Sequence, residues 1–490
     1  MKCALVVPPW RTEEIFLSAF SRSMRSYQEP SGPLYIGATL LEAGHETVLL
    51  DGALLNLEEI LAGLDAARPE FVGIYVCAPL WKAAKELVRA VKRRTPGVFV
   101  GVGGPWPSSM GARCFDDCPE LDAVFLGEGE FLAVETVDAL ERGISLVGIE
   151  GLIFRDPATG AVVENGDRAP IEDLDALPFP ARGLLGDNIQ LCSLPPGGYR
   201  RKPVAHLIGS RGCTNRCIYC YHYERKPRIR YRSPESMVAE MEECVERWGF
   251  REIRFLDDNF AGDRDRVLRF CALLQERGNR TPWYVSCRVD TMDGELLHAM
   301  KRAGCWAILY GIESGVQKNL DMLRKNVTLD QVRRVAAETK KAGIKMFTPF
   351  MFGIPGETFE EGLETIRFAI ELDPHYANFN CLTPFPGTWM WDHGHEYGTM
   401  VRDPARLTFQ GSAFIPDTMT ATELEDLRRI AFRRFYSRPR FMLRWLLQLR
   451  SLEDASTLMK GGLSFLVLWL RRGAFRFDPH HTGADDEDGG

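Results

Sequence analysis

The chain has 490 residues, of which 45% are hydrophobic and 26% charged, and its formal net charge is −7. This length allows two or three domains with cores of their own, and the acidic balance gives no sign of nucleic-acid binding. No apolar run is long enough to span a membrane and no secretory signal is visible at the N-terminus, so a cytoplasmic protein is expected. The 13 cysteines are an odd number, which suits a chain with reduced thiols.

Residues 1–145 alternate short apolar runs with helical patterns, which predicts a Rossmann-like, doubly wound parallel sheet covered by helices. No G-x-G-x-x-G motif follows the first strand, so a dinucleotide site is not expected there. Gly103 and Gly104 end a later strand, where they either let a bulky ligand approach the backbone or form a tight turn without a ligand. The expected strands are CALVVPP, HETVLLDG, FVGIYVCAP, VFVGVGGPWP and DAVFLGEGE, and the expected helices are residues 32–43, LEEILAGLDAARP and WKAAKELVRAVKRRTP.

This segment resembles the cobalamin-binding domain that precedes many radical S-adenosylmethionine (SAM) domains. The resemblance spans most of residues 1–140 and rests on the order of elements and on PLYIGATLLEAGHE, VGVGGPWP and FLGEGE. It implies a cobalamin near Gly103 and Gly104. The D-x-H-x-x-G signature that supplies a lower axial histidine to cobalt in many cobalamin proteins is absent, so Trp10 or Tyr75 would be packing neighbours rather than ligands. The alternative is a domain that keeps the fold but takes up no cobalamin.

Residues 146–200 are less regular and rich in proline and glycine, with LDALPFPARGLL as their clearest phrase. They are predicted to be a linker between two domains. The phrase resembles the connector between cobalamin-binding and radical SAM domains.

Three cysteines stand within eight residues of the segment HLIGSRGCTNRCIYCYH, with the spacing Cys-x-x-x-Cys-x-x-Cys. Thiolates bind iron–sulfur clusters and soft metals, and three ligands on a cubane leave one iron open to another donor. The alternative is zinc in a structural or interaction module, with His222 as a fourth ligand. The candidate metal ligands are Cys213, Cys217 and Cys220.

The same segment resembles the cluster loop of the radical SAM enzymes, with Tyr219 as the aromatic residue between the last two cysteines. The resemblance implies a [4Fe-4S] cluster whose open iron is chelated by the amino and carboxylate groups of SAM. An electron from a donor such as flavodoxin or ferredoxin would then produce a 5′-deoxyadenosyl radical that takes hydrogen from an unactivated carbon.

Residues 201–400 hold six strand and helix patterns in series, which predicts a partial (β/α)6 barrel related to the TIM barrel. In such barrels the chemistry gathers at the carboxyl ends of the strands. Asp257, Asp258 and Asn259 stand at one such end, where they bind a ligand or cap the next helix. Glu313 follows the apolar run ILYGI and would be costly to bury without a partner such as a cationic ligand.

The resemblance to radical SAM enzymes assigns cofactor contacts at these strand ends. Glu313 and Ser314 would contact the methionine moiety and ribose of SAM, and the backbone around Gly353 and Pro355 the adenine. Arg288 would pair with the SAM carboxylate or with substrate. The full set of SAM-binding candidates is Tyr219, Asp257, Ser286, Arg288, Glu313, Ser314, Gly353 and Pro355.

Residues 401–476 are predicted to form a helical C-terminal segment, from FRRFYSRPRFMLRWLLQLRS and LMKGGLSFLVLWLRR. Residues 421–473 contain eleven Lys/Arg against five Asp/Glu, so this segment is basic. A basic amphipathic helix with aromatic residues suits the inner face of a membrane, the barrel surface or a partner. Residues 477–490 are predicted to be a disordered acidic tail.

Together these resemblances imply a cobalamin-dependent radical SAM enzyme that C-methylates an unactivated carbon of a small natural-product or lipid-like intermediate. The first alternative is a non-methylating cyclase, ring-rearranging enzyme or dehydratase of the same architecture, acting in tetrapyrrole, hopanoid or secondary metabolism. The others are the cobalamin-free radical SAM enzyme and the zinc module.

Overall fold

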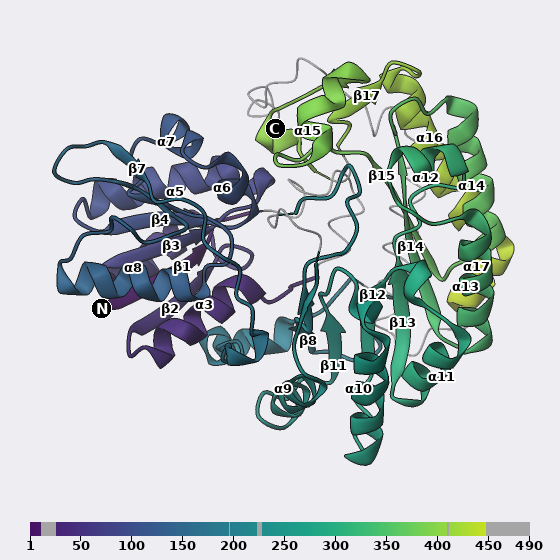
Figure 1. Ribbon diagram of the computed structural model, residues 1–490, viewed down its shortest axis with the longest axis horizontal. Coiled ribbons are helices and arrows are strands. Elements are labelled where there is room, and N and C mark those ends of the chain that lie inside the picture. Colours follow the sequence, from purple (N-terminus) through teal and green to yellow (C-terminus); the bar gives the residue numbers. More distant parts are fainter. Residues whose placement is uncertain (11–25, 196, 223–227, 409–410, 447–490) are drawn as a thin grey trace, which may run out of the picture.

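The computed structural model describes residues 1–10, 26–195, 197–222, 228–408 and 411–446. These residues form two α/β units that lie side by side, first a doubly wound sheet and then an open half-barrel (Figure 1). Both units of the predicted fold class are therefore present.

The first sheet has the strand order β2-β1-β3-β4-β5, followed by β6 and β7 at one edge. The pairs among β1 to β5 are parallel, and this 2-1-3-4-5 order is that of flavodoxin-like doubly wound folds, whose ligands lie at the carboxyl ends of the strands. The five expected strands are confirmed as β1 (Lys2–Val7), β2 (Glu46–Asp51), β3 (Phe71–Tyr75), β4 (Phe99–Gly103) and β5 (Ala123–Phe125).

The sheet does not end at residue 145. Strands β6 (Leu152–Arg155) and β7 (Val162–Glu164) extend it with antiparallel pairs, so part of the segment predicted to be a linker belongs to the first sheet. The run LIF of β6 is buried, but it is short and follows a glycine-rich turn, which hid the strand in the sequence. The rest of residues 146–200 carries only short 3₁₀ turns, including Arg182–Leu191.

Helices cover both faces of this sheet. Buried side chains of α3 and α8 share one apolar cluster with the sheet, whereas those of α4 and α5 share another. Helix α4 begins at a capping box, in which Asn56 accepts from the Glu59 amide and Glu59 accepts from the Asn56 amide. The helices are α3 (Ser31–Glu42), α4 (Leu57–Ala67), α5 (Trp81–Arg94), α6 (Pro105–Met110), α7 (Arg113–Asp117) and α8 (Glu130–Arg142).

The second sheet is the predicted six-stranded partial barrel. Its order is β8-β11-β12-β13-β14-β15 with all pairs parallel, so its two edges are not joined. The largest apolar cluster of the molecule lies between this sheet and its outer helices. The strands are β8 (Val204–Leu207), β11 (Glu252–Phe255), β12 (Trp283–Cys287), β13 (Cys305–Tyr310), β14 (Lys345–Phe352) and β15 (Tyr376–Cys381).

The helices outside the barrel begin at side-chain caps. Ser233, Asp263, Asp293, Thr328 and Thr358 each accept a backbone hydrogen bond at the start of the helix that follows. Because Asp263 caps α10, the capping alternative for Asp257, Asp258 and Asn259 is wrong. These helices are α9 (Pro234–Glu246), α10 (Arg264–Glu276), α11 (Gly294–Arg302), α13 (Leu329–Lys341) and α14 (Phe359–Leu372), and shorter pieces are α12 (Gln317–Met322) and α15 (Trp389–His393).

The predicted C-terminal segment is only partly helical. It starts with an antiparallel pair of strands, β16 (Gly398–Met400) and β17 (Phe414–Pro416), before α16 (Ala421–Tyr436) and α17 (Pro439–Leu446). Helix α16 packs on β15, where Phe432 and Phe435 contact the ring of Phe379. The rest of the predicted helical segment and the acidic tail, residues 447–490, lie outside the described residues. Within the described chain, no helix has both the length and the apolar character that crossing a membrane requires.

Candidate active site

The three-cysteine loop follows β9 (Ser210–Arg211) and precedes β10 (Arg230–Tyr231), which pair with each other at the carboxyl end of β8. Cys217 is buried, and Cys213 and Cys220 are half-buried. A hydrogen bond from the Cys220 thiol, aided by the charges of Lys325 and Arg288, lowers the pKa of Cys217 to about 6. The same bond raises the pKa of Cys220. One thiolate is therefore favoured next to a second sulfur, and thiolate is the form that binds metal.

A four-residue turn after α12, Leu323–Asn326, supports this loop from the barrel side. The Ile218 amide donates to the Leu323 carbonyl at 3.2 Å, and the Cys217 thiol lies 3.7 Å from the Arg324 carbonyl. Arg324 and Asn326 both have left-handed backbone conformations, with φ of 53° and 56°. Such conformations are uncommon outside glycine, so the turn is shaped at some energetic cost to meet the loop.

Lys325 carries a buried positive charge within this turn. Its Nζ lies 3.0 Å from Oε1 of Glu313 and 3.2 Å from the Tyr219 hydroxyl. Burial opposes the charge of Lys325, but the negative charges of Glu313, Cys217 and Cys220 together outweigh burial and raise the lysine pKa. The partner that buried Glu313 needs is thus a lysine of the chain itself, and the predicted contacts Tyr219 and Glu313 meet at that lysine.

Glu313 reaches this place because of its backbone. Its φ is 71°, and its amide and carbonyl bond to β14 at Pro349 and Met351. A Cβ on Gly311 would lie 2.6 Å from Oε1 of Glu313 and 2.9 Å from Nζ of Lys325. Glycine at 311 therefore leaves the room in which the ion pair sits.

Arg288 lies beside the same turn but is already paired. It donates to both carboxylate oxygens of Asp290 at 3.0 Å and to the Lys325 carbonyl at 2.7 Å. Ser286 shares one face of β12 with Tyr284, and its backbone pairs with β13. Among the described residues, the Ser286 hydroxyl has no hydrogen-bond partner. Ser286 is thus a polar group open to a ligand, whereas Arg288 positions the turn.

The Asp257 side chain contacts the segment that leads into the cluster loop. Its carboxylate accepts from the Gly209 amide at 2.8 Å and from the Ser210 hydroxyl at 2.5 Å, and burial raises its pKa to about 6. Asn259 accepts from the Arg288 amide at 3.2 Å. Asp257 and Asn259 therefore hold neighbouring chain segments in place.

Ser314 and the turn after β14 form a separate bonded group. The Ser314 hydroxyl is fully buried and bonds to Thr365, while Glu357 accepts from the Gly353 and Ile354 amides at 2.7 and 3.1 Å. Pro355 is buried within this turn. The backbone of Gly353 and Pro355 is consequently fixed by Glu357, a residue that the sequence patterns did not single out.

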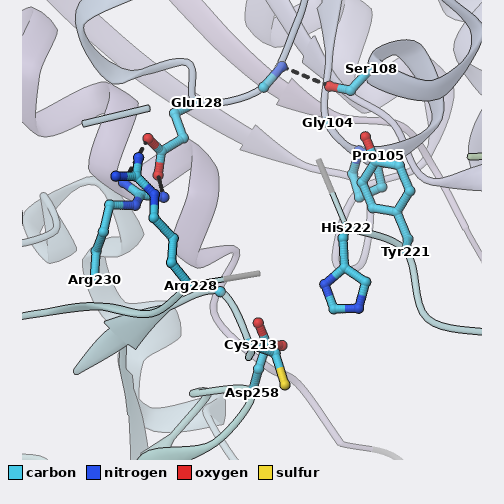
Figure 2. Close-up of a pocket in the computed structure, with 12 residues that line it drawn as sticks. Gly104, Pro105, Ser108, Glu128, Cys213, Tyr221, His222, Arg228, Arg230 and Asp258 are labelled. Carbon is cyan, nitrogen blue, oxygen red and sulfur yellow. Dashed lines mark hydrogen bonds and ion pairs between the residues drawn. The ribbon is translucent and has the colours of Figure 1, made fainter. Parts of the chain in front are cut away.

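A cavity of about 260 Å³ lies between the two α/β units (Figure 2). The first unit contributes Gly104 after β4, helix α6 and the loop after β5. The second unit contributes the cysteine loop, the strand end after β11, and β10 with the segment before it. Figure 2 shows Cys213 and Asp258 on one side and Tyr221 and His222 on another. Gly104 borders the cavity, but Gly103 does not. The lining residues are Gly104, Pro105, Ser108, Gly127, Glu128, Gly212, Cys213, Tyr221, His222, Arg228, Arg230 and Asp258.

Glu128 ties the two units together at this cavity. It accepts from Arg211 at 2.7 Å, from two nitrogens of Arg230 at 3.0 Å and from the Ile171 amide at 2.6 Å. Burial alone would raise the pKa of Glu128, but the bonds from Arg230 and Arg211 lower it overall. This carboxylate lies in FLGEGE, so the glycine-rich phrase supplied a signal for it, whereas nothing in LRKN marks Lys325.

Family comparisons agree with this geometry. Residues 207–369 match the model of the radical SAM superfamily, and residues 19–136 match that of the B12 binding domain. A protein of Pyrococcus horikoshii named an uncharacterized methyltransferase is 30% identical over 454 residues, covering 91% of this chain and 94% of the relative. The anaerobic magnesium-protoporphyrin IX monomethyl ester cyclase of Rubrivivax gelatinosus is 27% identical over 423 residues, covering 84% and 74%.

The fold is shared with a solved structure. The radical SAM methyltransferase TsrM from Kitasatospora setae, solved with cobalamin and a [4Fe-4S] cluster, aligns with a TM-score of 0.68 and 18% identity over 95% of this chain and 99% of that one. The fold and the three-cysteine loop define a radical SAM enzyme with an attached B12-binding domain. This chain belongs to that family, and its cofactors are a [4Fe-4S] cluster, SAM and cobalamin.

Proposed function

We propose that this enzyme transfers a methyl group to an unactivated carbon of a small natural-product or lipid-like biosynthetic intermediate. The observation that carries the proposal is the shared cavity, which is lined by Cys213 of the cluster loop and by Gly104 and Gly127 of the B12-binding domain. A reacting carbon held there would face both cofactors. The relative named a methyltransferase, which matches nearly the whole chain, supports this assignment.

When bound, the cluster with SAM supplies a carbon radical through hydrogen abstraction, and cobalamin supplies the methyl group. In our proposal Cys213, Cys217 and Cys220 hold the cluster. The proton in the hydrogen bond between the Cys217 and Cys220 sulfurs would be lost when the cluster binds. Glu313 would accept a hydrogen bond from the amino group of SAM while it stays paired with Lys325. Tyr219 holds Lys325 through its hydroxyl.

The remaining residues orient these groups. The backbone at Gly353 and Pro355, fixed by Glu357, would contact the adenine of bound SAM, and Ser286 would offer its hydroxyl to SAM or substrate. Ser314 acts through its backbone, because its hydroxyl is engaged within the protein. Asp257 and Arg288 position the loop and the turn. Gly104, which borders the cavity, would let cobalamin approach the end of β4, and Gly103 would act only as its neighbour on the strand.

The proposal is tested by identifying the products that the enzyme forms from SAM. We expect protein reconstituted with cluster and cobalamin, reduced chemically and incubated with SAM, to release 5′-deoxyadenosine and S-adenosylhomocysteine, because the second product reports a methyl group donated by SAM. With substrate present, the product gains the mass of one methylene. If 5′-deoxyadenosine forms and S-adenosylhomocysteine never does, methyl transfer is wrong.

A cyclase-like reaction is the second candidate, because the named magnesium-protoporphyrin cyclase covers 84% of this chain. It would give a product with no added methylene. The same mass measurement therefore separates the two functions.

We also propose that an electron donor such as flavodoxin or ferredoxin reduces the cluster. In the same proposal the protein is cytoplasmic and contacts the inner face of a membrane through its C-terminal helices. Met442 and Leu443 on α17 are 54% and 58% exposed, and Arg440 is exposed beside them. An apolar and basic helix face of this kind suits an anionic membrane surface. Met442→Glu/Leu443→Glu should reduce sedimentation with anionic vesicles, and unchanged sedimentation would contradict the membrane contact.

A further inference from the structure

A second cavity, of about 170 Å³, lies at the opposite end of the half-barrel from the cysteine loop. It is lined by Arg200, Arg201, Arg280, Pro282 and Gly304. These residues precede β8, β12 and β13, so the cavity opens at the amino ends of the strands. The mechanism proposed above uses none of them.

The three arginines concentrate positive charge around one small space. All three are exposed, and among the described residues no carboxylate pairs with their guanidinium groups. Several arginines on or next to the barrel helices do have acidic partners, as Arg269 has Glu235 and Arg277 has Glu242. Like charges repel, so such a group is favoured when an anion joins it.

The two neighbouring arginines stand on a firmly held segment. Both the Arg200 and Arg201 amides donate to Oε2 of Glu252, at 2.7 and 2.8 Å, and Oε1 of this fully buried carboxylate accepts from the Trp306 indole at 3.0 Å. Two residues after Arg201, the Pro203 carbonyl accepts a hydrogen bond from the Arg251 amide at 2.9 Å. The charge of Arg200 also acts on the Glu252 carboxylate. The bonds of Glu252 to the Arg200 and Arg201 amides fix the segment before any ligand arrives.

The opposite wall comes from backbone of unusual shape. Gly304 has φ of 102°, and a Cβ there would lie 3.1 Å from the Thr281 carbonyl. Pro282 is buried, and its carbonyl accepts from the Ile253 amide at 3.0 Å. Two arginines on one wall and one on the other thus face a space with a rigid lining.

We propose that this cavity binds a phosphate group through Arg200, Arg201 and Arg280. Guanidinium groups recognise phosphate by paired hydrogen bonds, and several of them can share one tetrahedral anion. The cavity is below the roughly 300–1,000 Å³ of pockets that enclose whole drug-sized ligands. It therefore takes a phosphate or diphosphate group, either free or at the end of a larger molecule such as a phospholipid.

The test measures binding of inorganic phosphate and of pyrophosphate to the full chain by titration calorimetry at constant ionic strength. We expect saturable binding at one site, weakened about tenfold or more in Arg200→Gln/Arg280→Gln. Arg93→Gln/Arg334→Gln removes the same charge from exposed arginines on α5 and α13 and should bind like the unaltered protein. The thermal midpoints of both variants serve as the check on folding.

A second arm separates the sources of phosphate. Sedimentation with phosphatidic acid vesicles, compared with neutral vesicles, detects a lipid headgroup, and only the part lost in Arg200→Gln/Arg280→Gln counts, since α17 also approaches membranes in our proposal. Loss of either free-phosphate binding or vesicle binding in this variant alone supports the site. Equal binding by both double variants in every arm, or no saturable binding at all, would overturn it.

Discussion

Lys325 sets the charge balance of the active site. It is the only cation within hydrogen-bond distance of Glu313 among the described residues, and both side chains are more than nine-tenths buried. Removing one member of a buried pair strands the other charge, at a cost of about 3–5 kcal/mol. Its neighbours Tyr219 and Cys217 would be disturbed with it.

We expect Lys325→Met to lower the free energy of unfolding of the cofactor-free protein by about 3–5 kcal/mol. Lys325→Met/Glu313→Gln should recover most of this loss, because no unpaired charge stays buried. Urea unfolding under anaerobic conditions measures both. Equal losses of unfolding free energy in the single and double variants would show that Lys325 does not stabilise the protein through Glu313.

Among single residues, the sequence marks candidate ligands more readily than the residues that support them. Cysteine spacing marks Cys213, Cys217 and Cys220 because the three thiols are close in the chain. Lys325 is more than 100 residues away from Tyr219, as the spacing of their hydrogen bond shows, and only the folded turn brings them together. Glu313 was expected to need a cation, but the sequence could not say that the chain itself provides one.

The turn after β14 depends on a single carboxyl group. Burial raises the pKa of Glu357 to about 8, although the amides of Ile354 and Gly353 oppose the shift. Because the pKa is raised in the folded state, the folded protein holds this proton more tightly than the unfolded chain. The contribution of Glu357 to stability is therefore present at low pH and is lost as pH rises toward 8.

Glu357→Gln should flatten the decline of the unfolding free energy between about pH 5 and pH 8, which this group steepens by up to about 1.4 kcal/mol per pH unit. Denaturant unfolding at several pH values measures the slope. Glu360→Gln, at an exposed carboxyl on α14, is the matched control. A slope unchanged by Glu357→Gln but changed by Glu360→Gln would contradict this role.

Helices and strands could be predicted where the spacing of apolar residues and the helix-capping residues indicate the same boundaries. The barrel strands read as apolar runs because both faces of a parallel sheet are covered, and each following helix starts at a Ser, Thr or Asp cap. Strands β6 and β7 were missed because they are short, and β7 is largely exposed, so no alternation marked it. Pairing of β6 with β5 and of β7 with β6 decides their conformation, and such pairing does not follow from the local sequence.

The junction of the two units is held by buried and half-buried charges. In addition to the bonds of Glu128, Arg182 of the connecting segment donates to Glu240 at 2.8 Å and to the His206 carbonyl at 2.8 Å. Arg182 also pairs with Glu29. These residues come from the first unit, the connector and the barrel. The placement of the two units relative to each other is thereby held by buried ion pairs and hydrogen bonds.

We expect Glu128→Gln to destabilise the protein by about 2 kcal/mol or more, because Arg211 and Arg230 lose their shared carboxylate. Glu172→Gln is the control, since this largely exposed partner of Arg228 should contribute under about 1 kcal/mol. Chemical unfolding of the two variants compares them. Equal effects would mean that the junction does not depend on Glu128.

The two units could be predicted from the sequence, but their shared cavity could not. Gly104 and Cys213 belong to separate motifs, and no pattern states that they face one space. The salt bridges of FLGEGE with Arg211 and Arg230 arise only when the units pack. The cavity is therefore the part of the site that the structure adds.

In our proposal this chain holds a cluster on its cysteine loop and cobalamin on its first unit, and the two separate sites meet at one cavity. Iron, sulfide and cobalt should be measured in anaerobically reconstituted protein that is supplied with hydroxocobalamin and then desalted, with Cys217→Ala in parallel. We predict that the unaltered protein retains all three and that Cys217→Ala loses iron and sulfide but keeps cobalt. Retention of iron with no cobalt in the unaltered protein, or of zinc in place of iron, would contradict the claim.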